Sequence, residues 1–149
     1  MATGFGLGWI AWAPGTFGSL IGVPLAWWLL GQSPSRQAVI AALLVAMAVP
    51  LCHWASLWMG GGDASQIVAD EYLAFPLTVI GLAMARRPWV IGAAFLLYRF
   101  FDILKPPPIN HIEAMGGGLG IVLDDVMAAL YARMALVAGL ALWRWYRTI

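Results

Sequence analysis

Long apolar segments separated by short polar turns dominate this sequence and restrict what it can fold into. The clearest runs from Gln37 to Met59, where His53 is the only acidic or basic side chain. Another runs from Ile121 to Trp143. As a helix rising 1.5 Å per residue, each is long enough to cross the roughly 30 Å hydrocarbon core of a bilayer. The segments therefore favour membrane-spanning helices over the core of a soluble domain.

The composition agrees with this interpretation. Hydrophobic residues make up 62% of the chain and charged residues 10%, whereas soluble domains are about 45–50% apolar and about 25% charged. Shorter apolar segments at Leu20–Leu30, 72–85 and Trp89–Leu104 complete the pattern. We predict an all-α integral membrane bundle of about four or five apolar helices, formed as one domain over residues 1–149. The net charge of +1 argues against a nucleic-acid partner, and the oligomeric state is left open.

All seven acidic residues lie between Asp63 and Asp125, at the predicted starts or ends of helices. Solvation at the headgroup level accounts for Asp63. It accounts less well for the adjacent pairs Asp70-Glu71 and Asp124-Asp125, which lead directly into apolar helices. A carboxylate at mid-bilayer costs roughly 2.5–3.5 kcal/mol on insertion scales, and neighbouring carboxylates repel each other. These pairs therefore need a compensating charge, which a divalent cation would supply.

Magnesium is the cation that this pattern favours, because Mg²⁺ prefers one or two carboxylates together with water and a substrate phosphate. Glu71, Asp102 and Asp125 arrive on three different predicted helices, so we predict them as metal ligands. Asp70 and Asp124 are predicted to act with them in catalysis, orienting a water or a lysine. Neighbours in a helix diverge by about 100°, and the spacing does not decide which member of each pair faces the metal.

Two cations accompany the acids, because Arg99 and Lys105 each lie three residues from Asp102. As intrahelical ion pairs they would contribute about 0.3–0.5 kcal/mol each. Alternatively, they form a phosphate clamp in which arginine forks onto two oxygens and lysine acts as a point charge. Beside the carboxylates the clamp is favoured, so we predict that Arg99 and Lys105 bind substrate phosphate.

Residues 4–19 contain five glycines and a proline, which makes a regular helix improbable there. A glycine-rich backbone with the hydroxyls of Thr16 and Ser19 can form an anion-binding nest. The simpler alternative is a Pro-Gly turn with Thr16 or Ser19 as the N-cap of the first span. Given the other motifs, we predict that both hydroxyls contribute to phosphate binding.

Four sequence blocks, in this order, resemble the phosphatidylglycerophosphatase A family. Each block alone is weak, but their combination is specific and extends over most of the chain. The blocks are Ala13-Pro14-Gly15-Thr16-Phe17-Gly18-Ser19-Leu20, the 63–71 segment ending in Ile67-Val68-Ala69-Asp70-Glu71, Arg99-Phe100-Phe101-Asp102-Ile103-Leu104-Lys105-Pro106, and 117–128 with Asp124-Asp125.

The resemblance implies a Mg²⁺-dependent phosphoric monoester hydrolase that removes the terminal phosphate of phosphatidylglycerophosphate and leaves phosphatidylglycerol. It further implies a multi-pass protein of the bacterial inner (cytoplasmic) membrane whose active site faces the cytoplasm. The positive-inside rule points the other way, because the motif loops and most arginines fall on opposite faces of a five-span bundle. An alternative function is a membrane transporter or channel in which intramembrane carboxylates line a cation path.

Overall fold

The computed structural model describes residues 1–10, 12–62, 64–113 and 116–148. Asp63, predicted to be solvated, lies outside them. The described chain is helical and contains no strand, as an all-α fold requires. Its elements, with η marking a 3₁₀ helix, are η1 (Gly4–Trp9), α1 (Pro14–Leu29), α2 (Pro34–Trp58), α3 (Ala69–Ala74), η2 (Phe75–Thr78), η3 (Ala83–Arg86), α4 (Pro88–Leu104), α5 (Ile109–Glu113) and α6 (Gly117–Thr148).

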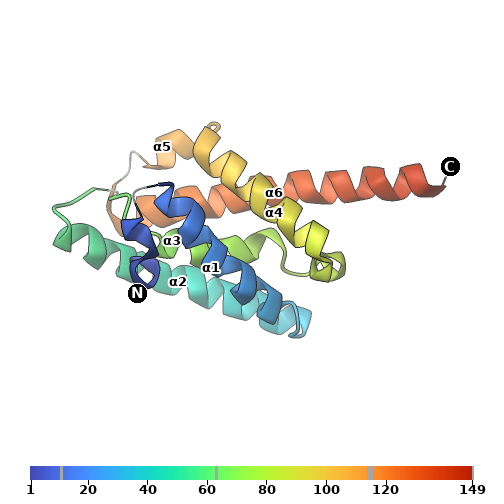
Figure 1. Cartoon of the computed structure of the whole chain (residues 1–149), viewed down its shortest axis with the longest axis horizontal. Coiled ribbons are helices and arrows are strands. Elements are labelled where there is room, and N and C mark those ends of the chain that lie inside the picture. The colour runs from blue at the N-terminus through green and yellow to red at the C-terminus, as the bar shows by residue number, and fades with distance from the viewer. Residues whose placement is uncertain (11, 63, 114–115, 149) are drawn as a thin grey trace.

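The long helices run between two ends of an elongated bundle (Figure 1). One end, the α5 end, holds the starts of α1 and α6 and the ends of α2 and α4. The other, the C-terminal end, holds the turn between α1 and α2, η3 and the end of the chain. Helix α6 packs against both α2 and α4, while α3 packs against α1, α2 and α6. Segments far apart in sequence therefore meet at the α5 end.

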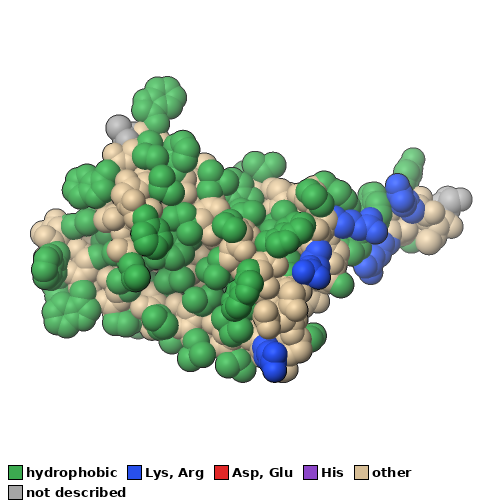
Figure 2. All heavy atoms as spheres, turned by 60° about the horizontal axis from the view of Figure 1, so that its bottom comes forward, with side chains coloured by type: hydrophobic (Ala, Val, Ile, Leu, Met, Phe, Trp, Pro, Cys, Tyr) green, Lys and Arg blue, Asp and Glu red, His purple; other side chains and the backbone are tan. Residues whose placement is uncertain are grey.

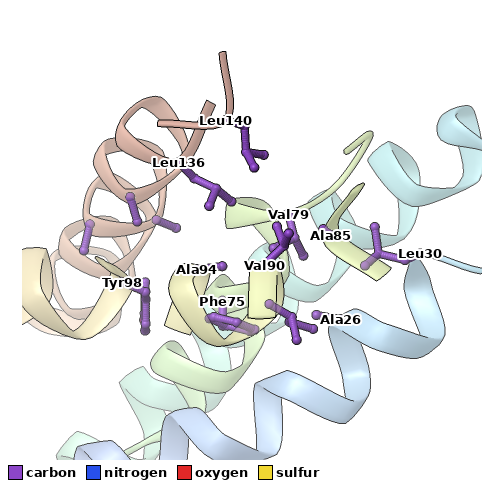
Figure 3. Packing of buried hydrophobic residues seen from close by; sticks show 14 of the residues in the cluster. Ala26, Leu30, Phe75, Val79, Ala85, Val90, Ala94, Tyr98, Leu136 and Leu140 are labelled. Carbon is purple, nitrogen blue, oxygen red and sulfur yellow. The ribbon is translucent and has the colours of Figure 1, made fainter. Parts of the chain in front are cut away.

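The larger of two clusters of buried hydrophobic residues in the described chain lies where α4, α6 and the segment after α3 meet (Figure 3). Phe75 contacts Tyr98 edge to face, with ring centroids 5.6 Å apart. On α6, Ala128, Ala129 and Ala132 are fully buried, and their small side chains let the neighbouring helices approach closely. The ring of Tyr98 is fully buried in this core, so its position is fixed by packing.

Two helices are long and apolar enough to cross a membrane, namely α2 with 25 residues and α6 with 32. Only 17% and 28% of their most apolar windows are buried, unlike the core helix of a soluble protein. Helices α1 and α4 have 16 and 17 residues, or about 24 and 26 Å, which is short for a core of about 30 Å.

The expectation that residues 4–19 form no regular helix is wrong from Pro14 onward, because α1 begins there. Proline suits the first turn of a helix, where its missing N–H is not needed. The glycines of this helix serve close packing, since a Cβ on Gly18 would lie 2.4 Å from Val68 Cβ. The helix has no side-chain N-cap, so neither Thr16 nor Ser19 caps it.

The apolar segment 72–85 is not one continuous helix, since it breaks into the end of α3, then η2 and η3. Polar side chains bind the backbone groups near the break. Gly81 N donates to Gln37 Oε1 at 2.7 Å, and Arg133 Nη1 donates to Ile80 O at 2.5 Å. Buried irregular backbone is stable when such partners satisfy its polar groups, which gives Gln37 and Arg133 a structural role.

Replacing Arg133 by leucine should destabilise the fold by about 1–3 kcal/mol, because the partly buried carbonyl oxygens of Leu77 and Ile80 would lose their donor. The measurement is the unfolding midpoint of the purified protein in detergent. Arg36→Leu is the matched control, since Arg36 is exposed near the start of α2. Equal midpoints for the two variants would contradict the role assigned to Arg133.

Candidate active site

A cavity of about 240 Å³ opens where α1 begins, α4 ends and the 65–71 segment meets α6, at the α5 end of the bundle (Figure 1). It brings together seven of the nine residues predicted from sequence to form the site. Five carboxyl groups and two cationic groups line it, beside Ser65, Ile67 and the backbone of α1. The lining residues are Ala13, Pro14, Gly15, Ser65, Ile67, Asp70, Glu71, Arg99, Asp102, Lys105, Asp124 and Asp125.

Arg99 holds one side of the cavity together. Its Nη1 donates to Glu71 Oε1 at 3.1 Å and to Ser19 Oγ at 3.3 Å, and it forms an ion pair with Asp102. Its side chain is 15% exposed, so these contacts are largely shielded from solvent. Arg99 Nε is buried and has no hydrogen-bond partner among the described residues. The guanidinium therefore links α1, α3 and α4 and keeps a donor that these partners do not use.

Lys105 and Tyr98 organise the other side. Lys105 adopts a left-handed conformation (φ 43°) as the C-cap of α4, and its Nζ lies 2.8 Å from Asp124 Oδ2. Asp124 Oδ1 accepts a hydrogen bond from Asp125 N at 2.8 Å. The Tyr98 hydroxyl donates to Asp125 Oδ1 at 2.6 Å. Tyr98 was not among the predicted site residues, because in sequence it is one more aromatic residue of an apolar helix.

Glu71 titrates in an unusual range. Burial raises the pKa of Glu71 to about 7, with the neighbouring Asp102 raising it further and the Arg99 guanidinium opposing the rise. Glu71 belongs to the short helix α3, outside both long candidate spans. Near neutral pH this carboxyl group therefore exchanges a proton readily, and a cation that binds it must compete with that proton.

The two predicted hydroxyls are placed differently from the seven cavity residues. Ser19 is fully buried. Its Oγ donates to Gly15 O at 2.7 Å and lies 3.1 Å from Glu71 Oε2. Ser19 therefore contacts Glu71 without lining the cavity. Thr16 is partly exposed on the first turns of α1 and is not among the residues that line the cavity. Their binding of phosphate stays a prediction.

Gly15 lies at the closest approach of α1 to the charged residues. A Cβ at this position would lie 2.1 Å from Glu71 Oε1 and 3.0 Å from Arg99 Nη2. Such distances require the two side chains to move. The absence of a side chain at position 15 therefore allows the pair between Glu71 and Arg99 to form beside α1.

Gly15→Ala should lower catalytic turnover by about 100-fold, because a displacement of about 1 Å at a reacting centre has effects of that size. The matched control is Gly139→Ala, since a Cβ there meets nothing within 4 Å. Turnover of both variants is compared after their unfolding midpoints are measured. A Gly15→Ala variant with the turnover of the wild type would show that this close approach is not needed.

The donor chemistry of the cavity fits Mg²⁺, because carboxylate oxygens are the ligands it prefers. The described residues hold no group of three or more His, Cys, Asp or Glu side chains arranged to bind a metal ion. Glu71 and Asp102 are instead paired with Arg99. A cation bound at the predicted ligands would therefore take over oxygens that the arginine now contacts.

Comparison with known proteins assigns the family. The family model named Phosphatidylglycerophosphatase A matches residues 1–140. A phosphatidylglycerophosphatase A of Haemophilus influenzae is 40% identical over 140 residues, covering 93% of this chain and 85% of that protein. One of Escherichia coli K12 is 35% identical over 132 residues, covering 87% and 76%.

A Bacteroides thetaiotaomicron protein, provisionally named phosphatidylinositol-3-phosphatase, is 33% identical over 142 residues, covering 89% of this chain and 86% of its own length. No solved structure shows a significant match to the chain. The family model covers all four sequence blocks and every residue that lines the cavity. The chain belongs to the phosphatidylglycerophosphatase A family.

Proposed function

We propose that this protein is a membrane phosphatase that hydrolyses the terminal phosphate monoester of phosphatidylglycerophosphate to phosphatidylglycerol and phosphate. Two relatives bear the corresponding name. The observation that carries the proposal is the single cavity in which five carboxyl groups meet Arg99 and Lys105. A transporter would need acids deep along a path, whereas these acids gather at one end of the bundle.

The charge balance of the cavity supports a metal cofactor. Its carboxyl groups outnumber its cationic groups by three, while a phosphate monoester carries about −1.5 to −2 charges at pH 7. Such a substrate would be repelled by the ionised carboxylates, whereas a bound cation would neutralise them and would favour the ionised form of Glu71. We assign Mg²⁺ to Glu71, Asp102 and Asp125. When bound, it would polarise the phosphoryl oxygen and lower the pKa of a water molecule.

The remaining side chains bind and orient. Arg99 can fork onto two phosphate oxygens, and Lys105 adds a point charge beside Asp124. Phosphate binding by Thr16 and Ser19 would require a rearrangement at the start of α1, because neither lines the cavity and the Ser19 hydroxyl donates to Gly15 O. Asp70 and Asp124 would orient the attacking water and Lys105, and a carboxylate of the cavity would accept the proton of that water. We favour direct in-line attack by water on phosphorus, in which the bond from phosphorus to the glycerol oxygen breaks and that oxygen takes up a proton.

For the membrane arrangement we propose that α1, α2, α4 and α6 cross the bilayer and that the broken 75–86 segment provides a fifth crossing. Apolar side chains cover most of the face in Figure 2, and arginines gather toward the C-terminal end. The cavity would then lie at one membrane face, and the acyl chains of the substrate would enter between helices.

We further propose that the cavity faces the cytoplasm, because the family implies a substrate made in that leaflet. The positive-inside rule favours the opposite orientation, because arginines gather at the C-terminal end. Cysteine labelling distinguishes the two orientations. In a Cys52→Ala background, a membrane-impermeant maleimide should label Tyr146→Cys in intact spheroplasts and label Trp58→Cys only after lysis. Both positions are well exposed, at 77% and 88%, and the reverse pattern would place the cavity outside.

The test of the activity is phosphate release by the purified protein reconstituted with phosphatidylglycerophosphate and Mg²⁺. A parallel reaction with phosphatidylinositol 3-phosphate is needed because one relative is named as a phosphatidylinositol-3-phosphatase. We expect release mainly from phosphatidylglycerophosphate. Faster release from the inositol lipid would change the assigned substrate, and no release from either lipid would overturn the phosphatase assignment.

A further inference from the structure

We propose that Tyr98 is a positioning residue that orients the carboxylate of Asp125 toward the cavity and thereby sets its affinity for a divalent cation. The proposal rests on the proposed function, in which Asp125 is a metal ligand. It concerns a side chain that does not line the cavity and therefore acts through Asp125.

The contact joins elements that are far apart in sequence. The Tyr98 hydroxyl lies 2.6 Å from Asp125 Oδ1, across the interface between α4 and α6. The same hydroxyl lies 3.3 Å from Glu71 O on α3. Tyr98 is fully buried and Asp125 is 3% exposed. One hydroxyl group therefore lies where the three helices that carry the carboxyl groups of the cavity meet.

The ring of Tyr98 holds this hydroxyl in place. Packing restricts the movement of the ring, because it lies in the hydrophobic core against Phe75, with ring centroids 5.6 Å apart (Figure 3). A buried carboxylate without an anchor can rotate about its terminal torsion, which has broad minima. A donor fixed on Oδ1 restricts that rotation and directs Oδ2. Partners of this kind orient metal ligands, and their loss typically lowers metal affinity about 10–100-fold.

Tyr98→Phe separates the hydroxyl from the ring, because phenylalanine keeps the packing and removes only the donor. We expect this variant to bind Mn²⁺, used as a spectroscopic probe for Mg²⁺, about 10–100-fold more weakly in an electron paramagnetic resonance titration. Tyr131→Phe is the matched control. Its hydroxyl also donates to an acceptor, Pro107 O at 3.0 Å, but outside the cavity, so its Mn²⁺ affinity should equal that of the wild type.

A second comparison distinguishes positioning from a general loss of structure. In an Asp125→Asn background, adding Tyr98→Phe should change Mn²⁺ affinity less than twofold, because the hydroxyl then has no carboxylate to orient. If Tyr98→Phe lowers the Mn²⁺ affinity by the same factor in both backgrounds, Tyr98 acts on the fold rather than through Asp125, and the proposal is overturned. This comparison uses each variant against its own background, so a modest shift in stability does not obscure it.

The outcomes also separate this proposal from the proposed function. If Tyr98→Phe binds Mn²⁺ as tightly as the wild type, the role of Tyr98 is overturned and the metal assignment is not affected. Wild type that binds no Mn²⁺ would overturn the metal assignment and this role with it. Weaker binding by Tyr98→Phe, with Tyr131→Phe unchanged and no further loss beside Asp125→Asn, would establish Tyr98 as the positioning residue of Asp125.

Discussion

Asp102→Asn should reduce kcat/KM for phosphatidylglycerophosphate by about 10²–10³-fold, the range seen when one preorganised electrostatic contact at a reacting centre is removed. The change keeps the shape of the side chain and removes its charge. Asp102 lines the cavity, pairs with Arg99 and is one of the proposed ligands. Its amide would bind a cation weakly and would leave Arg99 with less anionic partner charge. The measurement is steady-state phosphate release in mixed micelles.

The control for this prediction is Arg36→Gln, which also changes one charge but lies near the start of α2, at the other end of the bundle. We expect it to retain wild-type activity. Unfolding midpoints of both variants show whether the protein remains folded. Full activity of a folded Asp102→Asn variant would remove Asp102 from the proposed mechanism.

Removing divalent cations with EDTA should lower activity by at least about 10²–10³-fold, because Lewis-acid stabilisation is worth several kcal/mol and each 1.36 kcal/mol is tenfold in rate. Adding excess Mg²⁺ should restore the activity, which shows that the protein was not denatured. Phosphate release that persists in EDTA would contradict a metal-dependent reaction.

The response to Mg²⁺ should also depend on pH in a defined direction. Burial raises the pKa of Glu71 to about 7, so below this pH the group carries a proton that a cation must displace. The apparent Mg²⁺ affinity should therefore fall roughly tenfold for each unit below pH 7 and level off above it, as expected when one ligand must lose a proton. Glu71→Gln should remove this slope. An affinity that is independent of pH between 5 and 7 would exclude Glu71 as a ligand.

The sequence is most informative where residue type and position alone determine the outcome. The apolar segment Gln37–Met59 corresponds closely to α2, because length and hydrophobicity define a span. The charged residues could be selected as site candidates because charges in an apolar chain need compensation. The helical start of α1 was missed because glycine propensity is overridden where close packing, as at Gly18, requires small residues.

Other features depend on tertiary contacts that no local pattern contains. The only local signal for the break after α3 is the proline at position 76. The broken segment is stabilised by Gln37 and Arg133, which are remote from it in sequence. Tyr98 could not be recognised as part of the site, because its role depends on which face of α4 meets Asp125. A tyrosine one position before an arginine of the motif is too common a pattern to identify it.

In this structure Arg99 is the internal counterion of Glu71 and Asp102, two of the carboxylates that are proposed to bind metal. The same guanidinium is proposed to bind the substrate phosphate. An incoming divalent cation would replace the arginine at these carboxylates and release its donors for the phosphate, so Arg99 would exchange one anionic partner for another. Cation and lipid phosphate should then bind with positive coupling, each lowering the Kd of the other by the same factor.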